Sequence, residues 1–108
     1  MIVGVGCDIV KINRFSQNTE ALAQRILSNK ERELFYTYSN QRQLEYLAGH
    51  FAAKEAIIKA MDQNCVLSDF EILYENHKPI VKKEGYYIQI SISHEKEYAI
   101  AYAIVQRS

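Results

Sequence analysis

Hydrophobic and polar residues alternate over residues 2–10, and this period of two predicts a β-strand. One face of this strand is nearly bare, because Gly4 and Gly6 precede a single carboxylate, Asp8. The opposite face is apolar and carries Val3, Val5, Cys7 and Ile9. Glycine is uncommon inside strands unless a ligand or another backbone approaches closely, so the bare face is a candidate site. The simpler alternative is that Asp8 is only a surface carboxylate.

Helical spacing of apolar residues follows in three segments. The first covers residues 19–27. The second begins at Ser28, because a serine followed three residues later by Glu31 is the signature of a capping box. The third covers residues 40–61, and we expect Gln43 to cap its first residue by reaching back. A helix of about 20 residues is ~30 Å long, which is enough to cross a small domain.

The second half of the chain is strand-like. Alternation recurs over residues 70–75, 86–94 and 98–104, and a turn is expected at residues 76–79. The last of these strands sets one apolar face against an alanine face, with Tyr98, Ile100, Tyr102 and Ile104 opposite Ala99, Ala101 and Ala103. These elements predict one α+β domain over residues 1–108, with a long central helix packed on a mostly antiparallel sheet.

Composition narrows the function classes. The 108 residues hold 13 basic and 13 acidic side chains, a balance that argues against a dedicated nucleic-acid binder. No apolar run reaches the ~20 residues of a membrane helix, and the first residues do not resemble a signal peptide, so we expect a cytoplasmic protein without membrane contact. Cys7 and Cys65 form no zinc pattern, and we expect both to be reduced and buried.

Two further groups of residues can carry chemistry. Glu55 and Lys59 are i,i+4 neighbours on the long helix, amid small residues that allow close approach: Ala52, Ala53, Ala56 and Ala60. Together they could hold a divalent cation and an anionic phosphate, although a solvated ion pair is the simpler alternative. The sequence Ser-Ile-Ser-His at residues 91–94 could donate hydrogen bonds to an anion from a strand tip, or it could end a strand with a histidine satisfied by a neighbour.

Three segments then carry a family resemblance over essentially the whole chain. They are Gly-Val-Gly-Cys-Asp-Ile at residues 4–9, Leu-Ala-Gly-His-Phe-Ala-Ala-Lys-Glu-Ala-Ile-Ile-Lys-Ala at 47–60, and Ser-Ile-Ser-His at 91–94 leading to Tyr-Ala at 98–99. In this order they resemble the holo-acyl-carrier-protein synthases, the short bacterial 4′-phosphopantetheinyl transferases. The resemblance implies transfer of 4′-phosphopantetheine from coenzyme A to a serine of apo-acyl carrier protein, with adenosine 3′,5′-bisphosphate released, in fatty acid biosynthesis.

The resemblance also implies residue roles. The family uses Mg²⁺, and its metal-binding carboxylates match Asp8 and Glu55, while its motif lysine matches Lys59. Attack at a pyrophosphate needs in-line positioning and charge neutralisation, which two carboxylates, a metal and a lysine can supply. We expect the glycines beside Asp8 to let the pyrophosphate or the metal come close. The base that deprotonates the carrier serine stays open among a metal-bound water, Glu31 and Lys59.

Coenzyme binding is assigned to three more residues by the resemblance, namely His94, Lys54 and His50. Many relatives have an arginine where His50 stands, so we expect a weaker or pH-dependent phosphate contact. Residues 62–65 lack the glycine-rich turn that commonly follows the motif helix, and His77 replaces a usual turn glycine.

The partners follow from charge and size. Acyl carrier proteins are acidic, so a net-neutral enzyme needs a local basic surface, and Lys11, Arg14 and Arg25 are the candidates. Because a small domain buries little of its surface, we expect association through the face of Tyr98 and Tyr102. The resemblance implies a homotrimer with active sites in the clefts between subunits.

Two other function classes compete with this one. A non-catalytic coenzyme A or nucleotide-binding protein would keep the site without modifying a carrier, but simple binding does not require the metal pair. A structural or RNA-binding module is disfavoured by the neutral charge and the lack of a basic aromatic surface.

Overall fold

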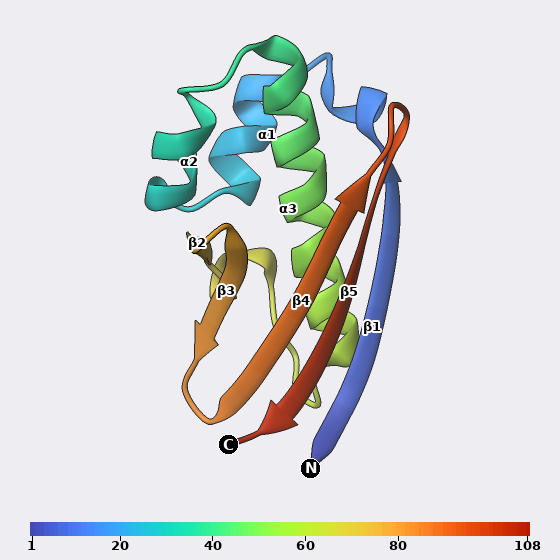
Figure 1. The fold of residues 1–108 in the computed structure, drawn as a ribbon, viewed down its shortest axis with the longest axis vertical. Helices are drawn as coiled ribbons and strands as arrows, with labels where there is room; N and C mark the ends of the chain where they lie inside the picture. Colours follow the sequence, from blue (N-terminus) through green and yellow to red (C-terminus); the bar gives the residue numbers. More distant parts are fainter.

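A single five-stranded sheet, antiparallel throughout, forms one layer of the molecule, and the helices cover one of its faces (Figure 1). The computed structural model describes residues 1–108. The strands lie in the order β1-β5-β4-β3-β2. Their bounds are β1 (Ile2–Lys11), β2 (Ile72–Glu75), β3 (Lys78–Lys83), β4 (Tyr86–His94) and β5 (Tyr98–Arg107). The predicted α+β class is confirmed.

The predicted helices are confirmed as α1 (Thr19–Ile26), α2 (Asn29–Phe35) and α3 (Asn40–Ala60), with short 3₁₀ turns η1 (Ile12–Phe15) and η2 (Leu67–Asp69). The capping box of α2 forms as expected, since the Ser28 hydroxyl accepts from Glu31 N and Glu31 accepts from Ser28 N. The predicted cap of α3 is wrong, because Ser39 is the N-cap and makes no side-chain bond. None of the helices is both long and apolar enough to cross a membrane.

Strand β3 was not predicted from the sequence, because only a turn was expected at its start. That turn forms, with Asn76 (φ 52°) and His77 (φ 66°) in the left-handed region. Two such residues in succession define the tight turn that joins neighbouring antiparallel strands, and here they connect β2 to β3. His77 therefore occupies a position that glycine would fill with less strain.

Helix α3 packs directly on the strand backbones. The alanine face of β5 lies beneath it, and Ala99, Ala101 and Ala103 are fully enclosed. Small side chains on the helix meet them, since Ala52 and Ala56 are also fully enclosed. The alanines on both elements therefore bring a long helix close to the centre of the sheet.

The glycines of β1 serve this packing. A Cβ atom added at Gly4 would lie 2.0 Å from the Ala60 carbonyl oxygen, and one added at Gly6 would lie 1.8 Å from the Ala56 carbonyl oxygen. The expectation that these glycines admit a pyrophosphate or a metal is thus wrong for the space directly above them. Another backbone, that of α3, is the close neighbour that excludes side chains here.

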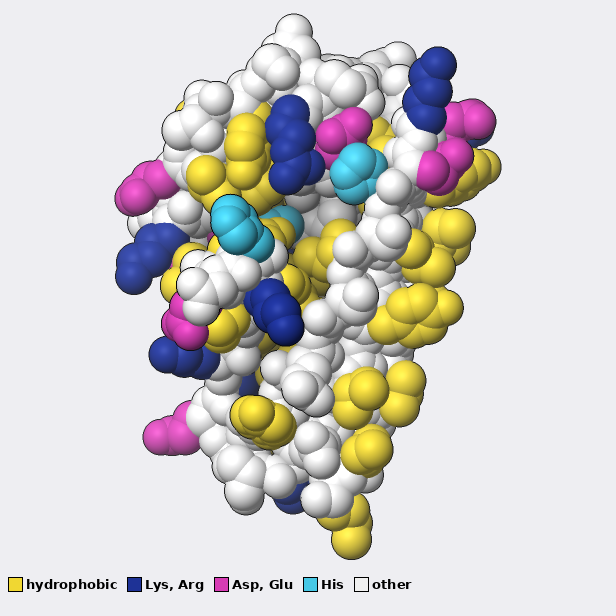
Figure 2. Space-filling view, in the orientation of Figure 1, with side chains coloured by type: hydrophobic (Ala, Val, Ile, Leu, Met, Phe, Trp, Pro, Cys, Tyr) yellow, Lys and Arg dark blue, Asp and Glu magenta, His cyan; other side chains and the backbone are white.

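The other face of the sheet has no helix over it. Its exposed apolar side chains run along β1 and β5: Val5, Ile9, Tyr98, Tyr102 and Ile104. Figure 2 shows hydrophobic side chains gathered along this side of the molecule. Cys7 belongs to the same face and is exposed, which corrects the prediction that it is buried, and Cys65 is half-buried. Both thiols are free.

Candidate functional site

Asp8 and Lys59 meet where β1 passes under the last turns of α3. Lys59 Nζ lies 3.1 Å from Asp8 Oδ1 and 2.9 Å from the carbonyl oxygen of Cys7. The helix runs antiparallel to β1, since Gly4 faces Ala60 and Gly6 faces Ala56. Side chains of a helix lean toward its N-terminus, so Lys59 leans along β1 toward Asp8. The two residues that the sequence analysis selected from distant segments are therefore in contact.

The donor set at this point suits a hard divalent cation. The second oxygen of Asp8, Oδ2, is enclosed and has no hydrogen-bond partner. Glu55 lies one helical turn before Lys59, is half-buried, and makes no hydrogen bond or ion pair. No three acidic, histidine or cysteine side chains gather anywhere in the chain. Two protein carboxylates nevertheless fit Mg²⁺, which usually keeps several water or phosphate ligands.

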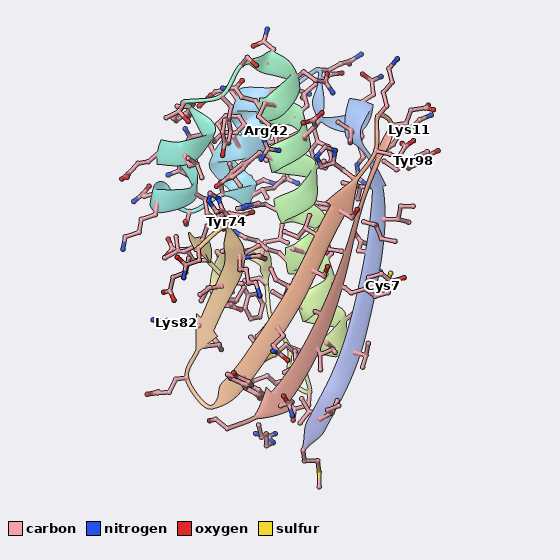
Figure 3. The ribbon with its side chains drawn as sticks, in the orientation of Figure 1. Cys7, Lys11, Arg42, Tyr74, Lys82 and Tyr98 are labelled. Atoms are coloured by element: carbon pink, nitrogen blue, oxygen red, sulfur yellow. The ribbon has the colours of Figure 1, made fainter.

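A cavity of about 1070 Å³ opens between the first half of α3 and strands β3 and β4. Its lining carries the cationic side chains Arg42, Lys78, Lys82 and Lys83 together with His77 and His94. Figure 2 shows the molecule hollowed here beside the histidines, and Figure 3 places Arg42, Tyr74 and Lys82 around the opening. The lysines were not selected from the sequence, because strand β3, which carries them, was not predicted.

His94 ends β4 and lines the cavity, while its role as an anion donor stays a prediction. Its side chain is half exposed, and its Nε2 atom lies 3.9 Å from Glu45 Oε1. The same carboxylate oxygen lies 3.8 Å from Arg42 Nη1. Glu45 therefore sits between two side chains that can carry positive charge at the cavity mouth.

The carboxylate pair and the cavity occupy different sides of the chain. Asp8 lies on the edge strand β1, the cavity lies over β3 and β4, and β5 separates them. Asp8, Glu55 and Lys59 do not line the cavity. In Figure 3, Cys7, the neighbour of Asp8, and Lys82 stand on opposite sides of the ribbon. One chain thus presents two separate candidate half-sites: one holds Asp8, Glu55 and Lys59, and the other is the cavity with its cationic side chains.

Lys54 does not face either half-site. Its ammonium is buried and donates to Glu31 Oε1 and to the carbonyl oxygen of Ile26, each at 2.7 Å. A lysine held inside the protein by two such bonds cannot reach a coenzyme without breaking a buried ion pair. This corrects the assignment of Lys54 as a coenzyme-binding residue.

Glu31 is likewise a structural group. Burial alone would raise its pKa, but the neighbouring His50 side chain and the hydrogen bond and charge of the Lys54 ammonium outweigh burial and hold the pKa at about 2. A carboxylate with so low a pKa and no access to solvent is a poor proton acceptor for a substrate hydroxyl. Glu31 is therefore removed from the alternatives for the general base.

His50 lies in the inner wall of the cavity. Its Nε2 atom is 3.0 Å from the Tyr74 hydroxyl, its Nδ1 atom is 3.3 Å from Glu31 Oε2, and its ring packs on Tyr46. Burial lowers the pKa of His50, so its imidazole is neutral near neutral pH. With a side chain only 1% exposed and its Nε2 atom bonded to Tyr74, His50 cannot reach a coenzyme in the cavity, which corrects its assignment as a coenzyme-binding residue.

The three basic residues expected at the carrier surface are all exposed. Lys11 ends β1, and Arg14 lies in the following turn η1 with its guanidinium 5.2 Å from the centre of the Phe51 ring. Arg25 lies in the last turn of α1. Figure 3 shows Lys11 beside Tyr98 at the end of the sheet remote from both termini. Their role in docking stays a prediction.

Comparison with known proteins gives consistent results. Residues 4–103 match the family model described as the 4'-phosphopantetheinyl transferase superfamily. The chain is 42% identical to a holo-[acyl-carrier-protein] synthase of Geobacillus sp. (strain WCH70), covering 99% of this chain and 98% of that protein. It is 44% identical to the enzyme of the same name from Mycoplasma mycoides, covering 98% and 96%.

A similar fold is found in a crystal structure of a holo-(acyl-carrier-protein) synthase from Bacillus anthracis in complex with CoA (3',5'-ADP). The TM-score is 0.93 at 35% sequence identity, and the match covers 100% of this chain and 99% of the other.

Proposed function

Because the chain belongs to the 4′-phosphopantetheinyl transferase superfamily, we infer that it transfers the 4′-phosphopantetheine moiety of coenzyme A to a serine of apo-acyl carrier protein. The other product is adenosine 3′,5′-bisphosphate. The observation that carries this conclusion is the match over nearly the full length of holo-[acyl-carrier-protein] synthases at more than 40% identity. The reaction belongs to fatty acid biosynthesis in the cytoplasm, as the family resemblance implies.

We propose that Asp8 and Glu55 hold Mg²⁺. The support is that the Asp8 Oδ2 atom is enclosed and has no hydrogen-bond partner, and that the Glu55 carboxylate makes no hydrogen bond or ion pair within the chain. The bound ion would supply charge neutralisation at the pyrophosphate. Lys59 then stabilises negative charge on the phosphate oxygens or the leaving group, since its exposed ammonium lies at the same place.

The cavity over β3 and β4 is the proposed site for the adenosine 3′,5′-bisphosphate part of coenzyme A. Its size suits a nucleotide, since ligand pockets commonly measure ~300–1,000 Å³. Its lysines and Arg42 provide the positive charge that phosphates require. His94 at the rim is the remaining candidate of the three coenzyme-binding residues that can contact a phosphate from solvent.

Two half-sites on one chain favour a shared active site. The phosphates of one coenzyme molecule must reach both the cations of the cavity and the carboxylates of Asp8 on β1 and Glu55 on α3, and within a chain β5 lies between β1 and the strands of the cavity. We therefore propose a homotrimer in which the cavity of one subunit faces Asp8 and Glu55 of the next. The exposed apolar face of β1 and β5 supports this assembly, because in a monomer this apolar sheet surface would be left in contact with water.

The carrier serine needs a proton acceptor, and two alternatives are left for it. One is a metal-bound water, and the other is Lys59 in its neutral form. The carrier itself is proposed to dock on the exposed basic residues Lys11, Arg14 and Arg25.

The test is incorporation of phosphopantetheine into the carrier. The protein is incubated with coenzyme A, Mg²⁺ and apo-acyl carrier protein, and the carrier is weighed by mass spectrometry. We expect a mass gain of one phosphopantetheine, and a fall in kcat of at least ~100-fold in Asp8→Ala and in Glu55→Ala. Glu33→Ala, which removes an exposed carboxylate from α2, is the matched control and should stay near wild type.

Each outcome separates the candidate functions. Coenzyme binding without a mass gain would favour the non-catalytic coenzyme A-binding protein. Near-native turnover in both carboxylate variants would refute the proposed metal site while leaving the transfer reaction in place.

A further inference from the structure

We propose that Lys59 is an internal counter-ion of Asp8. Its ammonium pairs with the Asp8 carboxylate in the metal-free protein and is displaced from it when a divalent cation binds. The inference rests on the proposed role of Asp8 and Glu55 as metal ligands. It gives the lysine a second role besides its proposed contact with phosphate. The observation behind it is that the ammonium lies on the ligand itself, 3.1 Å from Asp8 Oδ1.

Asp8 needs such a partner when no metal is present. Its side chain is only 17% exposed, and its Oδ2 atom is enclosed without a hydrogen bond. A mostly enclosed carboxylate is costly unless a positive charge or a donor lies beside it. Lys59 is the sole side chain that donates to this carboxylate.

The Lys59 side chain is also free to move away from Asp8. Its side chain is 56% exposed, and it lies in the last turn of α3 on a flexible four-carbon stem. An ion pair so open to solvent is weak. The contrast is Lys54, five residues earlier, whose ammonium is fully enclosed and bonded to Glu31 and to Ile26. The same helix therefore carries one lysine that is fixed and one that can move.

A divalent cation and an ammonium cannot share Asp8 without strong repulsion. Two like unit charges 4 Å apart repel by an amount worth about fivefold in affinity even in bulk water and by more near a protein surface, and a divalent ion doubles the repulsion energy. We therefore expect loading of the site to displace Lys59 Nζ from Asp8, which leaves its three N–H donors free for a phosphate oxygen. Metal binding and release of the lysine become one coupled event.

Metal affinity tests this coupling directly. Mn²⁺ serves as the probe, because the electron paramagnetic resonance signal of the free hydrated ion gives a dissociation constant without any turnover. The full-length protein is compared with Lys59→Met, Lys59→Arg, Asp8→Asn and the control Lys30→Met, which removes an exposed lysine of α2. Thermal unfolding of each variant establishes that it is folded at the temperature of the titration.

We expect Lys59→Met to bind Mn²⁺ roughly three- to tenfold more tightly than the wild type, because the competing ammonium is gone. Lys30→Met should differ from the wild type by less than about twofold, since its charge is screened. Lys59→Arg, which keeps a cation beside Asp8, should bind Mn²⁺ like the wild type. Asp8→Asn should bind it far more weakly.

The exchange is refuted if Lys59→Met binds Mn²⁺ as the wild type does, or more weakly, while Asp8→Asn loses binding; the proposed metal site then stands. It is refuted too if Lys59→Arg gains as much affinity as Lys59→Met. If Asp8→Asn keeps the wild-type affinity, Asp8 is not a ligand, and the metal site fails together with this inference.

Discussion

Lys54 Nζ lies 2.7 Å from Glu31 Oε1, and solvent reaches neither side chain. The same carboxylate accepts hydrogen bonds from the backbone nitrogens of Ser28 and Ile72, at 2.7 and 2.6 Å. Glu31 therefore joins α2, α3 and β2 at one point. Since Lys54 and Ala56 belong to the same helix, the buried pair also helps to fix the rotation of α3 that places Ala56 against Gly6 of β1.

Lys54→Met is expected to lower the free energy of unfolding by about 3–5 kcal/mol, because it leaves the Glu31 carboxylate buried without its counter-charge. Urea unfolding followed by circular dichroism measures the change. Lys30→Met is the matched control and should stay within about 0.5 kcal/mol of the wild type. A loss below 1 kcal/mol in Lys54→Met would mean that the pair is not a main determinant of stability.

Acid should weaken the fold in a defined window. The pKa of Glu31 is lowered in the folded protein from 4.5 to about 2, so its contribution to stability is complete above its unfolded value. That contribution is lost as the pH falls from about 4.5 toward 2. Melting temperatures recorded at intervals through this window should drop steeply in the wild type and less in Glu31→Gln. Parallel profiles for the two proteins would assign the acid sensitivity to other carboxylates.

Gly6→Ala is expected to cost at least ~2 kcal/mol, because its Cβ would overlap the Ala56 carbonyl and push α3 off β1. Gly85→Ala is the comparison, since nothing lies within 4 Å of its Cβ and only its φ of 86° is unfavourable. The Gly6 variant should be the less stable of the two in urea. The reverse order would contradict the close approach of helix and strand.

Arg14→Glu should raise KM for apo-acyl carrier protein several-fold and leave KM for coenzyme A nearly unchanged. The guanidinium lies over Phe51 on the exposed end of the sheet, where a reversed charge repels an acidic partner. Steady-state kinetics at two salt concentrations measure this, and the defect should be larger at low salt. An equal rise in both KM values would remove Arg14 from the docking surface.

Tyr102→Asp should dissociate the proposed trimer and abolish activity together. Tyr102 is an exposed side chain at the centre of the apolar sheet face, and a charge there opposes burial in an interface. Sedimentation and the transfer assay are run on the same samples, with Glu33→Ala as the control. A fully active monomer would refute the shared site.

The sequence predicted those parts of the fold that depend on local pattern. The capping box of Ser28 and the period-two alternation of β1 and β5 each concern residues close together in the chain. Strand β3 was missed because only six residues carry it and three of them are lysines, which gives no clear alternation.

The site was predicted in part for a similar reason. Asp8 and Lys59 could be selected by residue type and resemblance, and the structure brings them together. No pattern in sequence reveals that Lys54 points inward to Glu31, because neighbouring helical residues lie about 100° apart and burial depends on tertiary packing. The cationic cavity depends on the path of β3, and its lysines were therefore missed with that strand.

Gly4 contacts the carbonyl of Ala60, and Gly6 contacts that of Ala56. These two contacts also fix the axial position of α3 along β1. Two residues of a strand advance about 6.6 Å and four residues of a helix about 6 Å. Both glycines therefore meet a helix carbonyl when α3 lies at this position along β1. Sliding α3 by one turn toward the C-terminal end of β1 would bring the Ala56 carbonyl against the side chain of Asp8. Insertions or deletions between Ala56 and Ala60 are thus far less tolerable than changes in the loops, because they would shift the lysine away from the carboxylate that it must meet.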